Sequence, residues 1–130
     1  MIPERYAPMT YALFRIVFGY VFMIFGLQKI FGWFGAQSAV QLMSQQGAAG
    51  IIEAVGGLLI MLGLFTPVAA FIASGEMASA YFIAHAHPVL SWPLMNKGEL
   101  SVLYCFLFLY IAARGTGPYS LDRGFRRRVP

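Results

Sequence analysis

Long apolar runs alternate with short polar segments along the whole chain. They cover about residues 9–27, 48–65, 68–86 and 95–113, with 96–99 as the polar outer turn of the last run. Each run is close to the roughly 20 residues that a transmembrane helix needs. The dipeptide Thr66-Pro67 separates two runs, because proline lacks a backbone donor and disfavours a helical residue before it. The pattern predicts an all-α protein with four transmembrane helices in an antiparallel bundle, forming one domain over 1–130.

The segment between the first two runs has a pattern of its own. It contains no charged residue after Lys29. The spacing of Ala36, Ala39, Val40 and Met43 follows the i, i+3, i+4, i+7 rule of an amphipathic helix. This predicts a short interfacial helix at the membrane surface between the first and second spans. A polar turn without a role is the alternative.

The first run also raises the alternative of a cleaved signal peptide. It is longer than a typical signal core, and Glu4 beside Arg5 makes a weakly basic start. A helix that stays in the mature protein is the favoured interpretation.

The composition supports a membrane protein, and it argues against a nucleic-acid binder and against a protein that uses paired cysteines. Hydrophobic residues make up 59% of the 130 positions and charged residues 11%, whereas a soluble domain has about 25% charged residues. The net charge of +4 is concentrated in a basic tail, 114–130, that includes Arg123 and Arg126 to Arg128. A tail of this kind does not indicate a nucleic-acid binder. The only cysteine, Cys105, excludes an intramolecular disulfide and a CxxC redox pair.

The basic residues also predict an orientation. With both termini in the cytoplasm, the inner segments carry six arginines, and the outer loops carry only Lys29 and Lys97. Such a bias is typical of cytoplasmic segments. Trp33 and Trp92 then both fall at the outer interface, where aromatic residues gather. We therefore expect a multi-pass protein of the inner (plasma) membrane. The strong bias argues against a small multidrug exporter, whose membrane acid lies in its first span.

Two ionisable residues lie deep inside the predicted spans. A charge at the bilayer centre costs about 2.5–3.5 kcal/mol, so such residues face the bundle interior and have partners. Arg15 lies about 9 Å beyond Met9, and Glu76 about 12 Å beyond Val68, at 1.5 Å per residue. Because both helices start at the cytoplasmic face, the matching depths predict an ion pair between Arg15 and Glu76. A role in helix packing alone is the alternative.

A second set of polar residues gathers near the outer ends of the predicted helices. Two carboxylates brought close together bind a proton more readily than either alone. The candidate proton-exchange groups are Glu53, Glu76, Glu99 and His85. The candidate binding residues are Arg15, Gln28, Lys29, Asn96 and Lys97. The alternative is that lysines and glutamates at helix ends extend into the headgroups. No metal site is predicted, because the i, i+2 spacing of His85 and His87 does not place both rings on one helical face.

Several stretches in a fixed order resemble the DoxX family of small bacterial membrane proteins. They are LFRI at 13–16, GLQK at 26–29, FGWFG at 31–35, IEAVGG at 52–57, LGLFTP at 62–67, EMASAYF at 76–82, NKGE at 96–99 and GPYSLD at 117–122. The resemblance covers nearly the whole chain and implies a four-helix membrane bundle. It also implies an association with redox chemistry, because the family is named after subunits of an archaeal thiosulfate:quinone oxidoreductase. Other members are thought to belong to membrane complexes that handle oxidative and thiol stress.

The resemblance leads to two hypotheses. In the first, the protein is a quinone-linked redox component of a membrane complex, without a covalently bound cofactor and with a partner protein that supplies electrons. In the second, it is a non-catalytic anchor or assembly subunit, whose basic tail binds anionic lipid or the partner. A small transporter ranks third, and whether the chain is itself an enzyme is left open. The single cysteine and the lack of an extra-membrane domain argue against a stand-alone thiosulfate enzyme. The glycines also suit packing into a homo-oligomer.

Overall fold

The computed structural model describes residues 2–33, 43–85 and 98–128, and every regular element in these ranges is helical. In chain order the elements are the 3-10 turn η1 (Glu4–Tyr6), α1 (Ala7–Phe31), α2 (Gln45–Leu62), α3 (Thr66–Ala80), the π-helical turn η2 (Tyr81–His85), α5 (Glu99–Arg114) and α6 (Leu121–Arg128). This confirms the predicted all-α class. The four long helices begin or end within a few residues of the predicted runs.

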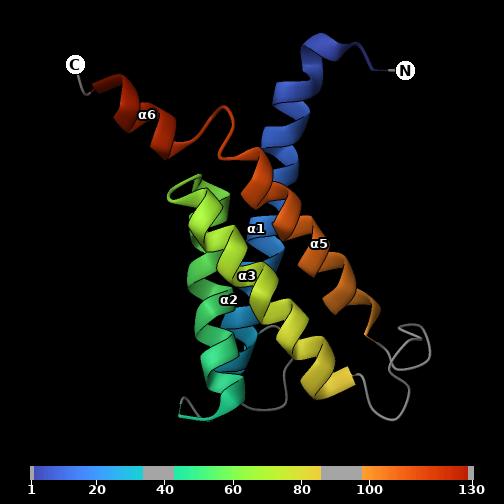
Figure 1. Cartoon of the computed structure of the whole chain (residues 1–130). Helices are drawn as coiled ribbons and strands as arrows, with labels where there is room; N and C mark the ends of the chain where they lie inside the picture. The colour runs from blue at the N-terminus through green and yellow to red at the C-terminus, as the bar shows by residue number, and fades with distance from the viewer. Residues whose placement is uncertain (1, 34–42, 86–97, 129–130) are drawn as a thin grey trace.

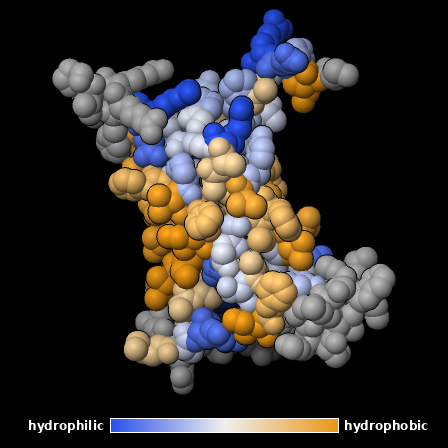
Figure 2. Space-filling view, viewed as in Figure 1, coloured by the Kyte–Doolittle hydropathy of each residue, from blue (hydrophilic) through white to orange (hydrophobic). Residues whose placement is uncertain are grey.

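Two of these helices are long and apolar enough to cross a membrane. Among the described residues they are α1 together with the turn before it (Glu4–Phe31), and α2. The helices α3 and α5 have 15 and 16 residues. On the face shown in Figure 2, apolar residues gather in the middle and hydrophilic ones toward the two ends. This distribution suits a surface that faces lipid in the middle and water at the ends.

A tight turn joins α2 to α3 where the sequence predicts a break. Gly63 ends α2 in the left-handed conformation, with φ 72°, and the amide of Leu64 donates to the carbonyl of Leu59 at 2.9 Å. This is the common way to satisfy the last carbonyls of a helix. Pro67 lies in the first turn of α3, where its missing donor costs nothing. The two helices therefore run in opposite directions and diverge away from the turn (Figure 1).

Glycines allow α1 and α2 to pack with their backbones close together. A Cβ atom added at Gly26 would lie 2.2 Å from the backbone nitrogen of Ala54, and one at Gly57 would lie 2.4 Å from that of Met23. Gly19 is equally confined, by the backbone of Met61 at 2.5 Å. Small residues permit this approach in membrane helices. The result is a tightly joined pair against which the other helices pack.

Aromatic and small side chains fill the space between this pair and the pair formed by α3 and α5. The rings of Phe22 and Phe108 lie 4.6 Å apart, and Tyr104 stacks on Phe108 at 5.6 Å. Ser74 of α3 donates from Oγ to the backbone carbonyl of Cys105 at 2.7 Å. Cys105 thus lies in the helix contact, half-buried, with a free thiol.

Two predicted segments have different outcomes. The predicted interfacial helix falls on residues outside the described ranges, apart from Met43, whose side chain is fully exposed. Within the basic tail, Leu121–Arg128 form α6.

Candidate functional site

One lysine and two glutamates from three helices form the charged cluster of the interior. Lys29 of α1 contacts Glu53 of α2, with Nζ 2.5 Å from Oε1. The carboxyl group of Glu53 also adjoins that of Glu76 of α3, close enough for a hydrogen bond. The Glu53 side chain is 2% exposed and that of Lys29 36% exposed. We call these three residues the acid cluster.

The charges and hydrogen-bonding groups of the acid cluster are suited to binding one proton. Each carboxyl group keeps a buried oxygen, Oε2, that has no hydrogen-bond partner in the described part of the chain. Two ionised carboxylates and one ammonium group carry a net charge of −1, which is unfavourable in a low-dielectric interior. A single proton shared by Glu53 and Glu76 would give a neutral cluster and supply a donor to an acceptor that lacks one. The arrangement is thus chemically suited to holding and releasing a proton.

The turn between α2 and α3 explains why the two carboxyl groups meet. In a helical hairpin, residues equally far from the turn lie at the same level. Glu53 lies ten positions before Gly63, and Glu76 lies ten positions after Thr66. At 1.5 Å per residue, both lie about 15 Å from the turn.

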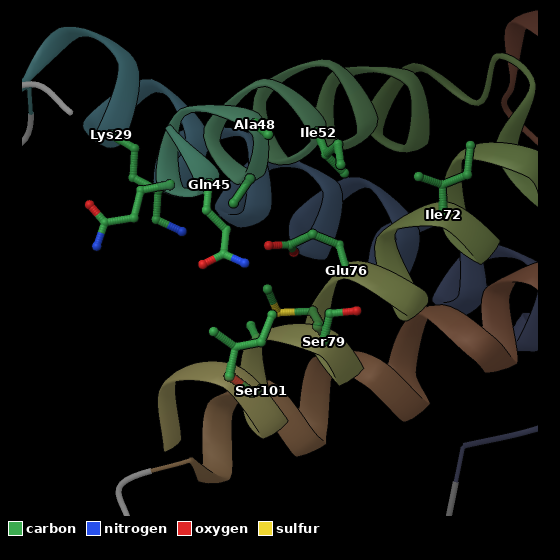
Figure 3. A pocket seen from close by; sticks show the side chains of 13 residues that line it. Lys29, Gln45, Ala48, Ile52, Ile72, Glu76, Ser79 and Ser101 are labelled. Carbon is green, nitrogen blue, oxygen red and sulfur yellow. The ribbon is translucent and has the colours of Figure 1, made fainter. Parts of the chain in front are cut away.

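A cavity of about 880 Å³ opens beside the acid cluster, where α2 and α3 diverge. Its polar lining includes Lys29, Gln45, Gln46, Glu76, Ser79 and Ser101, and its apolar lining includes Ala48, Ala49, Ile52, Ile72, Met77, Ala80 and Ile83. Gln45 and Glu76 both point toward the space between the helices (Figure 3). The volume lies in the range of small-molecule sites, and mostly apolar walls with a few polar groups are typical of them.

Arg15 is not paired with Glu76, and the predicted ion pair is wrong. The fully buried guanidinium donates to the backbone carbonyls of Thr116, Pro118 and Tyr119 at 2.5, 3.1 and 2.8 Å. These carbonyls belong to the segment that follows α5. The two residues lie at different depths because α1 extends past the α2–α3 turn (Figure 1). Arg15 therefore lies at the level of this turn, with its Cζ 3.1 Å from where a Cβ of Gly63 would be.

Two further predicted site residues, Gln28 and Glu99, do not line this cavity. Glu99 is exposed at the start of α5 and is not among the lining residues of the cavity. Gln28 is half-buried one position before Lys29. The backbone of His85 belongs to η2, and Asn96 and Lys97 lie outside the described residues. Trp33 stacks on Phe31 at 4.5 Å, near the end of α1 that carries the acid cluster.

The sequence analysis does not single out four polar residues of the cavity, Gln45, Gln46, Ser79 and Ser101. Gln45 is the first residue of α2, and Ser44 before it caps the helix by accepting from the amide of Gly47 at 3.1 Å. A serine at this position is a recognisable helix start. A helix that begins at Gln45 has Gln45 one turn before Ala49 and two turns before Glu53, on the same helix face.

Comparison with known proteins gives the family. The family model described as DoxX matches residues 10–86. An uncharacterized protein of Haemophilus influenzae is 42% identical, over 96% of this chain and 97% of its own. The inner membrane protein YqjF of Escherichia coli is 33% identical, over 84% of this chain and 86% of its own. No solved structure gives a significant match. The chain therefore belongs to the DoxX family of membrane proteins.

Proposed function

We propose that this protein is the quinone-binding membrane component of a redox or thiol-stress complex, and that the cavity beside the acid cluster binds the quinone headgroup. The observation that carries the proposal is the position of Glu76. It lines the cavity on one side and adjoins Glu53 on the other. A molecule in the cavity would therefore be within reach of a carboxyl group that shares a proton.

The residues of the cavity fit a planar apolar ring with polar edges. Ile52, Ile72 and Ile83 provide apolar walls, while Gln45 and Ser79 provide donors and acceptors at the rim. Ser79 already donates from Oγ to the carbonyl of Gly75 at 2.9 Å, so its oxygen remains able to accept. Quinone reduction consumes one proton for each electron, and the electrons would come from a redox centre of a partner protein. Glu76 would hold the proton at its carboxyl oxygen. After the proton leaves, Lys29 would balance one of the two carboxylates, and a proton taken up from water would restore the neutral cluster.

This proposal includes a membrane topology. The four long helices would all span the bilayer, with α3 and η2 acting as one span and both termini in the cytoplasm. The exposed apolar side chains of α3 and α5 support the placement of these two helices in the bilayer, because Phe71 and Phe106 are each 65% exposed. In water, such a surface would be a large exposed apolar patch.

A non-catalytic anchor is the second candidate. It is favoured by the contact between Lys29 and Glu53, because an ion pair between α1 and α2 would also serve to fix two helices. In that case, the acid cluster would be purely structural, and loss of the Glu76 carboxylate would change no ligand content.

Quinone content separates the two candidates. The protein would be purified in mild detergent, and extracted lipids would be quantified by mass spectrometry. We expect a near-equimolar quinone in the wild type and its loss in Glu76→Gln, with the melting temperature kept. Glu99→Gln is the matched control, because it removes a carboxylate that does not line the cavity. Equal quinone content in both variants, or no quinone in the wild type, would favour the anchor.

A further inference from the structure

A second cavity lies at the opposite end of the molecule, between the two ends of the chain. It has a volume of about 620 Å³. Arg5 and Tyr6 line it from the start of the chain, and Tyr119 and Arg123 line it from the segment around the start of α6. It is remote from the acid cluster, because α1 measures about 36 Å from Ala7 to Phe31 at 1.5 Å per residue.

We propose that this cavity binds the phosphate group of an anionic phospholipid. Two guanidinium groups from opposite ends of the chain face one space, and guanidinium groups bind phosphate with paired, charge-assisted hydrogen bonds. Neither Arg5 nor Arg123 forms an ion pair with any residue in the described part of the chain. Arg5 instead lies over the ring of Tyr6, 4.9 Å from its centroid.

The nearby carboxylates do not neutralise this cavity. Asp122 precedes Arg123, but its two oxygens accept from the amide of Phe65 at 3.1 Å and the hydroxyl of Thr116 at 3.0 Å. Glu4 precedes Arg5 and lines a different hollow, on the side of Arg114. Neither carboxylate lines the cavity between Arg5 and Arg123, so its charge is positive.

The surface below the cavity favours a lipid over a free phosphate compound. Met9 lines the cavity, and one exposed apolar stripe continues from it along α1 through Leu13, Val17 and Tyr20. Residues spaced by three or four positions share one helix face. An acyl chain could follow this stripe while its phosphate stayed between the arginines. The distance of about 36 Å along α1 exceeds the hydrocarbon core of about 30 Å, which places Arg5 at headgroup level when Phe31 lies at the other interface.

The backbone at Tyr119 supports a built site. Tyr119 has φ 55°, a left-handed conformation that is unusual for a bulky residue. It is held there because its carbonyl accepts from the guanidinium of Arg15 at 2.8 Å. Tyr119 lines the cavity and is 73% exposed. Tyrosine is a residue that membrane interfaces favour.

Native mass spectrometry of the full chain tests this proposal. The protein would be exchanged into detergent with phosphatidylglycerol or phosphatidylcholine. We expect selective retention of one phosphatidylglycerol and, in the double variant Arg5→Gln/Arg123→Gln, an affinity lower on the order of tenfold to a hundredfold. Arg114→Gln is the matched control, because Arg114 lies near the same end but does not line this cavity. Melting temperatures would show that all variants are folded.

A competition experiment separates the two sources of phosphate. Inorganic phosphate in large excess should leave phosphatidylglycerol bound if the acyl chain contributes along the Met9 stripe. Displacement of the lipid by inorganic phosphate would overturn the lipid assignment in favour of a soluble phosphate compound. Equal retention of phosphatidylglycerol by the wild type and the double variant would overturn the site itself.

Discussion

Glu53 and Glu76 adjoin each other inside the bundle because they lie equally far from the turn that joins α2 to α3. Lys29 contacts the same group from α1, so three helices meet at one cluster. The residues that join these three helices are therefore the same residues that form the candidate proton site. It also means that the lysine and the two glutamates should not behave as independent residues when they are changed.

Lys29→Met should destabilise the protein through this coupling. It leaves the buried carboxylate of Glu53 without its cation, and breaking a fully buried pair typically costs 3–5 kcal/mol. Because the Lys29 side chain is 36% exposed, we expect a smaller loss of about 2 kcal/mol. Thermal melting in detergent measures it. The double variant Lys29→Met/Glu53→Gln should recover most of the loss, and a purely additive double variant would contradict the coupling.

Arg15→Gln should destabilise the protein by a different route. The shorter amide leaves at least two of the carbonyls of Thr116, Pro118 and Tyr119 without a donor. A fully buried group left unsatisfied costs about 1–3 kcal/mol. Because these carbonyls are only part-buried, we expect the loss of two donors to cost about 2–4 kcal/mol in total. Thermal melting again measures it. Arg114→Gln, at the same end of the bundle, should change the melting temperature little.

Combining Arg15→Gln with Glu76→Gln tests the correction to the predicted ion pair. Sites that share no partner contribute additively within about 0.5 kcal/mol. We therefore expect the stability change of the double variant to equal the sum of the changes of the two single variants, which is close to that of Arg15→Gln alone. A coupling energy clearly above that limit would mean that Arg15 and Glu76 interact after all.

The helices could be predicted from the sequence, because apolar runs and Thr66-Pro67 report directly on helices and their breaks. The meeting of Glu53 and Glu76 was also within reach, since both can be counted from that turn. The apolar ends of the runs do not report the relative depth of Arg15 and Glu76, because α1 extends beyond the turn. The partners of Arg15 could not be found this way. They are backbone carbonyls, which every residue has, in a segment without hydrophobic periodicity.

Filling the cavity beside the acid cluster should block ligand binding without changing any charge. Ala48 lines the cavity and is exposed in it, so Ala48→Phe places a ring in the space that we assign to the quinone headgroup. We expect quinone affinity to fall on the order of tenfold or more. Val55→Phe is the control, because Val55 lies on α2 but is 53% exposed away from the cavity. Retention of quinone by Ala48→Phe would exclude this cavity as the site.

The glycines of α1 and α3 should respond oppositely to the same substitution. In Gly26→Ala the new methyl group would lie 2.2 Å from the backbone nitrogen of Ala54, so α1 and α2 must separate. Overpacking of this kind typically costs about 1–3 kcal/mol. A Cβ at Gly75 would meet nothing within 4 Å, so Gly75→Ala should gain up to about 1 kcal/mol from helix propensity. The melting temperatures of the two variants, measured side by side with the wild type, would show whether Gly26→Ala destabilises the protein and Gly75→Ala stabilises it. A Gly26→Ala variant as stable as Gly75→Ala would mean that the close contact between α1 and α2 does not hold the bundle together.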